Sequence, residues 1–412
     1  MQIVIVAIGN EVLSGAVINS NAAYISHCLE ENGWEIARHL VLPDEPAILS
    51  YELKVLCETF DLVILTGGLG PTHDDVTRDV IVAIFDTPLV FHESLYEKLM
   101  HRYSKVAPWL PKQQSYLPSA CQLLENTVGA APGIIMKKKA MHMVVLPGVP
   151  REVQEIVKSG LLPYLIEKYP PKLRKCKRHY NFCLLTESQI DNVLQEIQRK
   201  IPNISSGVYP KYGRLVQASL MAYGSEAEKF LEQGEEILLS YFSSKLYSKG
   251  QPEIALAIQE LFIAQEWRLA FAESCTGGAL AAAVTTHPNS SQYFSGSIVS
   301  YANSVKEDLL NVTFDYQGAV SEKVALKMAE ESLNILKANF SIAVTGIAGP
   351  GGGSEEKPVG TVWIAVAEKD SETKTFLIQR QGKRAHIIDY TVNHALSLLW
   401  QCAKERLSSC RL

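Results

Sequence analysis

The sequence lacks the features that mark membrane proteins, secreted proteins and nucleic-acid-binding proteins. No uninterrupted apolar run reaches about 18 residues, the length that spans a bilayer. The first residues, 1–6, carry no basic segment and predict a buried strand rather than a signal peptide. A net charge of −5 offers no broad basic surface to a nucleic acid. These absences favour a cytoplasmic protein that handles small molecules.

Cysteine chemistry is equally sparse. The eight cysteines form no CxxC pair, and no cysteine–histidine cluster has the spacing of a zinc finger. Most of them are therefore expected to be small buried apolar residues. Only Cys275 lies in a segment with the character of a reaction site.

The chain contains enough hydrophobic residues to form the cores of several folded domains. The chain has 412 residues, of which 47% are hydrophobic, and this length suggests about two to four domains. In residues 1–170, apolar strands alternate with amphipathic helices, which predicts an α/β domain with a largely parallel sheet. The expected strands are 2–8, 35–42 and 62–65, and the expected helices are 20–32 and 46–59.

Prolines and a basic segment predict a boundary near residue 170. Residues 171–248 then favour a small α+β module in the order strand, helix, strand, strand, helix. Residues 249–412 return to α/β alternation, which predicts a third domain. Its expected helices are 253–265, 276–286, 304–311, 321–337 and 384–406, and its expected strands are 267–273, 295–301, 341–345, 359–367 and 374–380.

A glycine-rich loop, TGGLGPTHDDVT at 66–77, follows a buried strand and leads into a helix. Glycines let the backbone approach a ligand closely, and the amides at a helix N-terminus favour anions such as phosphate. Asp74 and Asp75 suit a divalent cation, because hard cations prefer carboxylate oxygens. The plainer interpretation is a tight turn with one aspartate as the helix N-cap.

A second loop, GNEVLSG at 9–15, follows the first strand, and Asn19-Ser20-Asn21 begins the next helix. In a parallel sheet both loops lie at the carboxyl ends of the strands, where ligands bind. With the segments 126–133 and 146–152, they resemble the molybdopterin-binding-like (MoCF-like) domain, most closely its version in the competence/damage-inducible CinA family.

For this domain the resemblance implies hydrolysis of ADP-ribose to AMP and ribose 5-phosphate with a divalent metal (Mg, Mn or Co). It assigns the metal or the base to Glu11, Asp74 and Asp75, and nucleotide binding to Gly9, Asn10, Asn21, Gly67, Gly68 and Thr77. The family often has Asp-Thr-Asn where this chain has Asn19-Ser20-Asn21. That departure leaves open a domain that binds its nucleotide without fast hydrolysis.

In the third domain, the strand 268–272 runs into ESCTGG at 273–278. Ser274 and Cys275 are adjacent candidates for a nucleophile at this strand-to-helix junction, where the helix end supplies a positive field. A cysteine nucleophile needs a histidine or a helix end to form its thiolate, and the nearest histidine is about three turns away, which favours Ser274.

The base for Ser274 is expected in SYANSVKE at 300–307. The pattern of Ser304 and Glu307 predicts a capping box with Lys306 as the second helical residue. There the helix dipole favours the neutral amine that a general base requires. A solvated lysine at a helix start is the alternative. Tyr301 is either a core residue or a proton-relay partner.

A third loop, VTGIAGPGGG at 344–353, could supply an oxyanion hole or a phosphate cradle from its amides. The three segments together resemble the CinA C-terminal domain, the nicotinamide mononucleotide (NMN) deamidase family. The resemblance implies Ser274 as nucleophile, Lys306 as general base and Tyr301 as an assisting hydroxyl, without a cofactor. It implies a substrate site of Thr276, Gly277, Thr345, Gly346, Gly349 and Arg384. Ile388 stands where the family often has a further arginine.

The combined expectation is an α/β enzyme with two hydrolase activities on NMN and ADP-ribose. The middle module resembles the KH-like connector of the family and is expected to help the chain form a homodimer. The GxxG loop of nucleic-acid-binding KH modules is absent from 177–245, so a nucleic-acid partner is not expected. The alternative is a catalytically impaired nucleotide-binding scaffold that acts in competence or the DNA-damage response.

Overall fold

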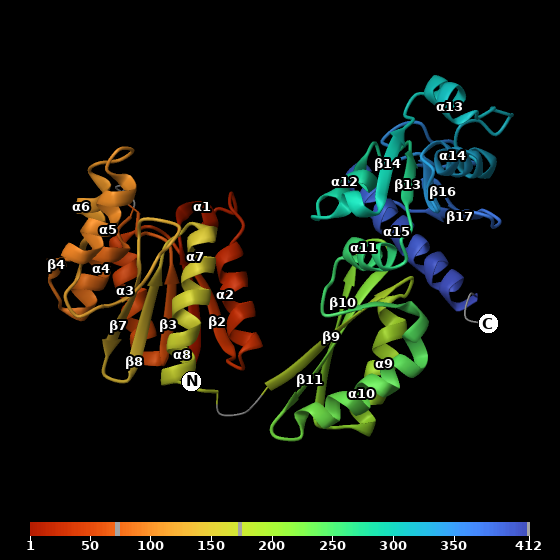
Figure 1. Ribbon diagram of the computed structural model, residues 1–412. Helices are drawn as coiled ribbons and strands as arrows, with labels where there is room; N and C mark the ends of the chain where they lie inside the picture. The colour runs from red at the N-terminus through yellow and green to blue at the C-terminus, as the bar shows by residue number, and fades with distance from the viewer. Residues whose placement is uncertain (71–74, 172–174, 410–412) are drawn as a thin grey trace. The chain divides into compact units, whose positions relative to one another are not determined.

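The computed structural model describes residues 1–70, 75–171 and 175–409, which form two compact units, Met1–Lys175 and Cys176–Leu412 (Figure 1). Both units are α/β, as the sequence predicts. In the described part no helix combines the length and the apolar character needed to cross a membrane. Seven cysteines are described; all are free and five are buried, which agrees with the expectation of small apolar residues.

The first unit contains a six-stranded mixed sheet in the order β2-β1-β3-β8-β7-β6. The pairs β1–β2, β1–β3 and β3–β8 are parallel, whereas β7 pairs antiparallel with both β8 and β6. The prediction of a largely parallel sheet is therefore confirmed for four of the six strands. The strands are β1 (Ile3–Ile8), β2 (Ile36–Leu42), β3 (Leu62–Thr66), β6 (Gln122–Leu124), β7 (Gly133–Lys138) and β8 (Met141–Leu146), and a separate pair is β4 (Leu89–Phe91) with β5 (Tyr116–Pro118).

Helices cover both faces of this sheet, which explains the continuous apolar runs of its central strands. Ile3 and Ile5 of β1 pack on the side of α2, α7 and α8, and Val4 and Val6 pack on the side of α3 and α4. The helices are α1 (Asn10–Leu13), α2 (Ser20–Glu31), α3 (Pro46–Thr59), α4 (Thr77–Phe85), α5 (Glu93–Tyr103), α6 (Leu110–Gln114), α7 (Pro150–Ile156) and α8 (Leu162–Lys168).

The second unit begins with a module of four strands in the order β10-β11-β9-β12. The expected strand and helix order is present, and β12 is a further strand, paired antiparallel with β9. Thr186 and Gln189 form a capping box that starts α9. The elements are β9 (Lys175–Cys183), α9 (Glu187–Lys200), β10 (Ile204–Lys211), β11 (Leu215–Tyr223), α10 (Ala227–Phe242) and β12 (Leu246–Lys249).

A five-stranded sheet, β14-β13-β15-β16-β17, forms the rest of this unit. One face carries large side chains such as Phe271 and Ile342, which pack against α11, α12 and α15. The other face carries Ala272, Ala343 and Ala365 under α14. The elements are α11 (Ile254–Ala264), β13 (Leu269–Glu273), α12 (Ala279–Thr285), β14 (Phe294–Val299), α13 (Asn303–Leu310), α14 (Glu322–Ile335), β15 (Phe340–Gly346), β16 (Thr361–Glu368), β17 (Lys374–Gln379) and α15 (Arg384–Ser409).

Contacts with α15 join the four-stranded module to the five-stranded sheet. Lys245 Nζ donates to Gln401 Oε1 at 3.1 Å, and the His394 ring lies 3.4 Å from the Gly213 carbonyl oxygen. Leu215 and Tyr247 of the module belong to the apolar core of the sheet. The second and third expected domains therefore pack as one compact unit.

Candidate active sites

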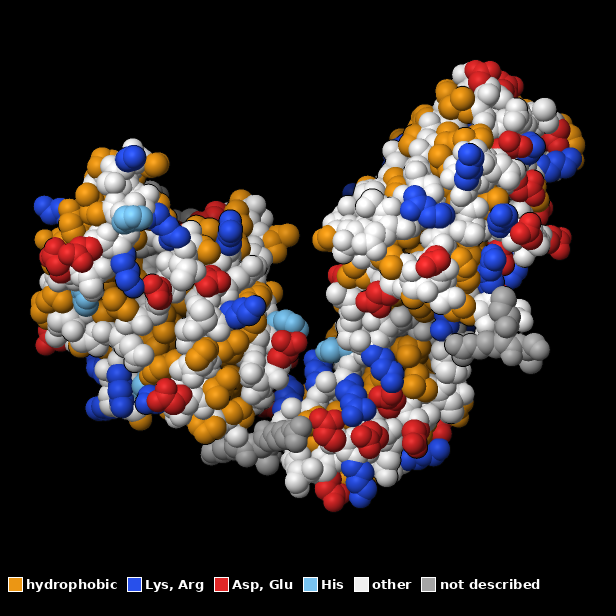
Figure 2. All heavy atoms as spheres, viewed as in Figure 1, with side chains coloured by type: hydrophobic (Ala, Val, Ile, Leu, Met, Phe, Trp, Pro, Cys, Tyr) orange, Lys and Arg blue, Asp and Glu red, His pale blue; other side chains and the backbone are white. Residues whose placement is uncertain are grey.

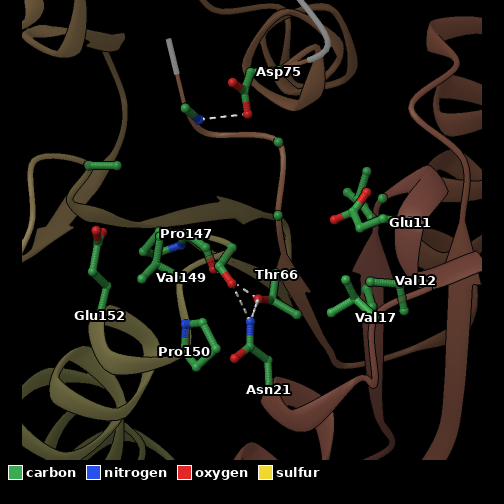
Figure 3. A pocket seen from close by; sticks show the side chains of 18 of the residues that line it. Glu11, Val12, Val17, Asn21, Thr66, Asp75, Pro147, Val149, Pro150 and Glu152 are labelled. Carbon is green, nitrogen blue, oxygen red and sulfur yellow. Dashed lines mark hydrogen bonds between the residues drawn. The ribbon is translucent and has the colours of Figure 1, made fainter. Parts of the chain in front are cut away.

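The first candidate site is a cavity of about 720 Å³ in the first unit (Figure 3). Register pairs Ala7 with Thr66 and Thr66 with Leu146, so the loops after β1, β3 and β8 leave the sheet at the same edge. These loops and the start of α2 line the cavity. Of the residues that the sequence predicts for this site, Gly9, Asn10, Glu11, Asn21, Gly67, Gly68 and Asp75 line it.

Asn21 connects the segments that line this cavity through hydrogen bonds. Its Nδ2 donates to Thr66 Oγ1 at 3.0 Å and to the Gly148 carbonyl oxygen at 2.8 Å, and Thr66 Oγ1 donates to the Pro147 carbonyl oxygen at 2.9 Å (Figure 3). One side chain thus ties α2 to two strand ends. This gives Asn21 a role in shaping the site.

Asn19, the position where the family often has aspartate, caps α2. Its Oδ1 accepts a hydrogen bond of 3.0 Å from the Ala22 amide. Asparagine and aspartate cap helices about equally well, so the exchange preserves the helix start and removes only the charge.

Thr77 contacts the glycine-rich loop and lies outside the cavity lining. Its hydroxyl is buried and donates to the Gly67 carbonyl oxygen at 3.2 Å, and the residue is not among those that line the cavity. A Cβ on Gly68 would lie 1.9 Å from this hydroxyl. The structure therefore places Thr77 as a support for Gly67 and Gly68.

Carboxylates dominate the charge of this cavity. Glu11, Asp44, Asp75 and Glu152 line it, and none of its described lining residues is a lysine or an arginine. Figure 3 shows Glu11, Asp75 and Glu152 on different sides of the opening. Asp75 Oδ1 accepts from the Gly70 amide at 2.7 Å. The other predicted aspartate, Asp74, lies outside the described residues.

These carboxylates fit a hard divalent cation whose remaining ligands would come from a bound substrate and water. Within the described ranges no group of three or more ligating side chains lies ready for a metal. Magnesium is commonly held by one or two carboxylates together with phosphate oxygens and water. Glu11 and Asp75 supply carboxylates of that kind.

Glu152 is a lining residue to which the sequence assigned no role. Its Oε2 accepts a hydrogen bond of 2.7 Å from Asn126 Nδ2, and a Cβ on Gly129 would overlap the carboxylate. Burial raises the pKa of Glu152 above its usual value, against the effect of the Asn126 hydrogen bond. The sequence feature that could have indicated Glu152 is an acidic residue shortly after the loop that follows a buried strand.

The second candidate site lies at the carboxyl edge of the five-stranded sheet. Glu273 pairs with Val299 and with Val344 in the parallel register, so Ser274, Ser300 and Thr345 follow side by side. The Ser274 amide donates to the Val344 carbonyl oxygen at 3.0 Å, and the Ser300 amide donates to the Glu273 carbonyl oxygen at 2.8 Å. The three predicted loops therefore meet at one edge.

The carboxylate of Glu273 links the segments at this edge, a role that the sequence does not predict. Glu273 is fully buried and accepts five hydrogen bonds of 2.9–3.0 Å. The donors are the Thr276 and Ser297 hydroxyls and the amides of Gly278, Leu280 and Ala281. The start of α12 thus binds an internal carboxylate. The amides of Gly278, Leu280 and Ala281 are therefore engaged by Glu273 and are not free for the nucleophile.

Lys306 is buried on α13, and the expected capping box is wrong. The N-cap is Ala302, without a side-chain hydrogen bond, so Lys306 is the fourth helical residue. It is 1% exposed, and its Nζ donates to the carbonyl oxygens of Ser300 at 2.6 Å and Tyr301 at 3.3 Å. Burial lowers the pKa of Lys306 below that of an ordinary lysine. The alternative of a solvated lysine does not hold.

The two candidate nucleophiles differ in their surroundings. Cys275 belongs to the apolar core, and burial raises the pKa of its thiol to about 12, although the charges of Arg384 and Lys306 act in the opposite direction. The thiol is therefore protonated at neutral pH. Ser274 is 9% exposed, and in the described part of the chain its hydroxyl forms no hydrogen bond.

Arg384 connects two other predicted residues. Its guanidinium donates to the Gly349 carbonyl oxygen at 2.9 Å and to Tyr301 Oη at 2.8 Å. Tyr301 is 59% exposed, so it is not a core residue. Arg384 is also exposed and begins α15. The pair offers a cation and a hydroxyl to a ligand at this edge.

The remaining predicted residues shape the loops. Thr345 is buried and its hydroxyl donates to the Ala319 carbonyl oxygen at 2.8 Å. Gly277 and Gly349 have left-handed φ values of +61° and +78°. A Cβ on Gly346 would lie 2.6 Å from the Val362 side chain, so glycine is required there.

Comparisons with known proteins agree with these two units. Residues 4–167 match the family described as a probable molybdopterin binding domain, and residues 251–403 match the CinA C-terminal domain. A competence-damage inducible protein of Acetivibrio thermocellus is 34% identical over 409 residues, which cover 97% of this chain and 98% of that protein. One from Halothermothrix orenii is 34% identical over 390 residues, which cover 92% of this chain and 93% of that protein.

Among solved structures, the competence/damage inducible protein CihA from Agrobacterium tumefaciens is 40% identical and covers 36% of this chain and 92% of its own, with a TM-score of 0.35. The fold and the two loop-lined edges define a protein with a MoCF-like domain and a CinA C-terminal domain. The chain belongs to the CinA family of competence-damage inducible proteins.

Replacement of Glu273 by glutamine is expected to lower the free energy of unfolding by about 2–4 kcal/mol, because an amide group would face five donors with only one acceptor oxygen. Urea unfolding of the full chain measures this change. Glu260→Gln, at an exposed position of α11, is the control and should change the stability by less than about 0.5 kcal/mol. Equal free energies of unfolding for the two variants would contradict the role of Glu273 as a buried hydrogen-bond acceptor that stabilises the fold.

Proposed function

We propose that the second unit hydrolyses the carboxamide of NMN to nicotinic acid mononucleotide and ammonia. The observation that carries this proposal is a buried lysine amine at the sheet edge that also presents Ser274. A lysine with a lowered pKa can act as a general base near neutral pH. The protonated thiol of Cys275 leaves Ser274 as the nucleophile of the pair.

The proposed reaction is acyl transfer through Ser274. Neutral Lys306 takes the proton of the Ser274 hydroxyl while Oγ attacks the carboxamide carbon. The C–N bond then breaks, and the lysine proton goes to the leaving nitrogen, which departs as ammonia. Water attacks the resulting ester, gives its proton to Lys306 and releases the carboxylic acid, and Ser274 regains its proton.

The loop after β15 is suited to the oxyanion of this reaction. Within the described residues, the amides of Ala348 and Gly349 donate to no other group. Preorganised amides of this kind stabilise a tetrahedral intermediate, and the loss of one donor costs roughly 10²–10³ in turnover.

Arg384 is the proposed partner of the substrate phosphate, and Tyr301 beside it is a further donor. Ile388, where the family often has an arginine, is half-buried against the apolar core one turn along α15. The proposed phosphate site therefore relies on Arg384 without support from that position.

For the first unit we propose hydrolysis of ADP-ribose to AMP and ribose 5-phosphate. The support is a cavity of nucleotide size whose described lining holds four carboxylates and no basic side chain. A diphosphate cannot enter such a site without a compensating cation, so a divalent metal near Glu11 and Asp75 is part of the proposal. When bound, the metal offsets diphosphate charge and activates water.

In an assay of ammonia release from NMN, Ser274→Ala and Lys306→Met are expected to lose at least about 10³-fold in kcat, because they remove the nucleophile and the base. Cys275→Ala is the matched control at the neighbouring position and should stay within about tenfold of the unchanged chain. Retained activity of Ser274→Ala together with loss in Cys275→Ala would show that the cysteine is the nucleophile.

The pH dependence of the same reaction reports on Lys306. The base acts in its neutral form, so kcat/KM should rise with pH as Lys306 loses its proton. Because burial lowers this pKa, the rise should occur below 10.5, where an ordinary lysine titrates. Lys369→Met, at an exposed position, should leave the profile unchanged. A rate that falls across this pH range would exclude a lysine base.

AMP formation from ADP-ribose tests the first unit. Activity should require Mg²⁺, Mn²⁺ or Co²⁺ and should vanish with a chelator, and Glu11→Gln and Asp75→Asn should each lower it at least about tenfold. Asp86→Asn is the control, because Asp86 is exposed and asparagine tolerates its left-handed backbone. Equal AMP formation with and without chelator would rule out the proposed metal.

A further inference from the structure

A second large cavity lies within the second unit, apart from the Ser274 edge. Its volume is about 830 Å³, and its walls come from the end of β10, the start of α11, the segment after β17 and the middle of α15. The predicted reaction residues Ser274, Lys306 and Arg384 are not among its lining residues. The proposed functions leave this cavity without a role.

The charges that face this cavity are predominantly positive. Lys211 and Arg380 line it, and the only acidic lining residue in the described part is Glu253. Both cations are exposed, and within the described residues neither forms an ion pair. Two uncompensated cations on one cavity favour an anionic ligand.

Aromatic rings form the other part of the lining. The Tyr390 ring stacks on the ring of His394, with centroids 5.6 Å apart, and Arg380 lies over Tyr390 at 5.1 Å. Tyr212 stacks on His386, with centroids 5.9 Å apart. The Tyr390 ring is thus covered by His394 and Arg380, whereas Tyr212 has one stacked partner and is 51% exposed, so a flat heterocycle can pack against the Tyr212 ring.

Two further polar side chains in the lining are available to a ligand. His287 is half-buried, and within the described part of the chain neither its ring nor the Asn393 amide forms a hydrogen bond. A few polar groups on a concave, partly apolar surface are typical of small-molecule sites of about 300–1,000 Å³. The volume of this cavity is of that size.

We propose that this cavity binds a phosphate-bearing nucleotide, with its base against the Tyr212 ring and its phosphate at Lys211 and Arg380. His287 and Asn393 supply hydrogen bonds to the sugar or the base. This site is separate from the two proposed reaction sites, and it does not depend on either activity.

Photoaffinity labelling of the full chain with 8-azido-AMP, followed by peptide mapping, tests the proposal without any turnover. Label is expected on peptides that contain Tyr212, His287 or Tyr390, and excess AMP should displace it. The double variant Lys211→Gln with Arg380→Gln should lower this labelling at least about tenfold, because it removes both charge-assisted contacts to phosphate.

The control is Lys369→Gln with Arg199→Gln, which removes the same charge from exposed positions that do not line the cavity and should leave the labelling unchanged. Label confined to the first unit or to the Ser274 edge would overturn the proposal, as would equal labelling of the two double variants. Light scattering adds a second criterion. If the cavity variant changes the oligomeric mass of the chain and no label maps to the cavity, the surface is an interface between copies.

Discussion

A single buried carboxylate, that of Glu273, holds together the segments from which the second candidate site is built. It links the end of β13, the turn that carries Ser274, the start of α12 and Ser297 on β14. A buried charge is tolerated only when donors surround it, and here all the donors come from the protein itself. The position of Ser274 therefore depends on a neighbour that need not touch substrate.

The two candidate sites differ in the charged groups that they offer to the anionic nucleotides proposed as their substrates. The described walls of the first cavity hold only acidic charges, so the ADP-ribose proposed to bind there would need an accompanying cation. The second site offers Arg384, the Ala348 and Gly349 amides, which have no partner among the described residues, and a lysine whose pKa burial lowers. Figure 2 shows positive and negative side chains intermingled over the visible surface, so attraction of nucleotides depends on these local groups.

Periodicity and loop position predicted the alternating strands and helices, because a strand covered on both faces must be apolar throughout. They also predicted which loops meet, since parallel strands end at one edge. The antiparallel pairing of β7 and β16 could not be predicted, because pairing direction leaves no mark in a short apolar run. Roles that depend on burial were missed: Glu273, Glu152 and the true start of α13 all follow from packing between distant segments.

The buried thiol of Cys275 has a consequence for how the protein meets its chemical surroundings. A thiol that stays protonated and sheltered reacts slowly with alkylating agents, peroxides and disulfides. A serine beside it carries no such liability. If Ser274 is the nucleophile, as proposed, the second site therefore does not depend on the oxidation state of a thiol.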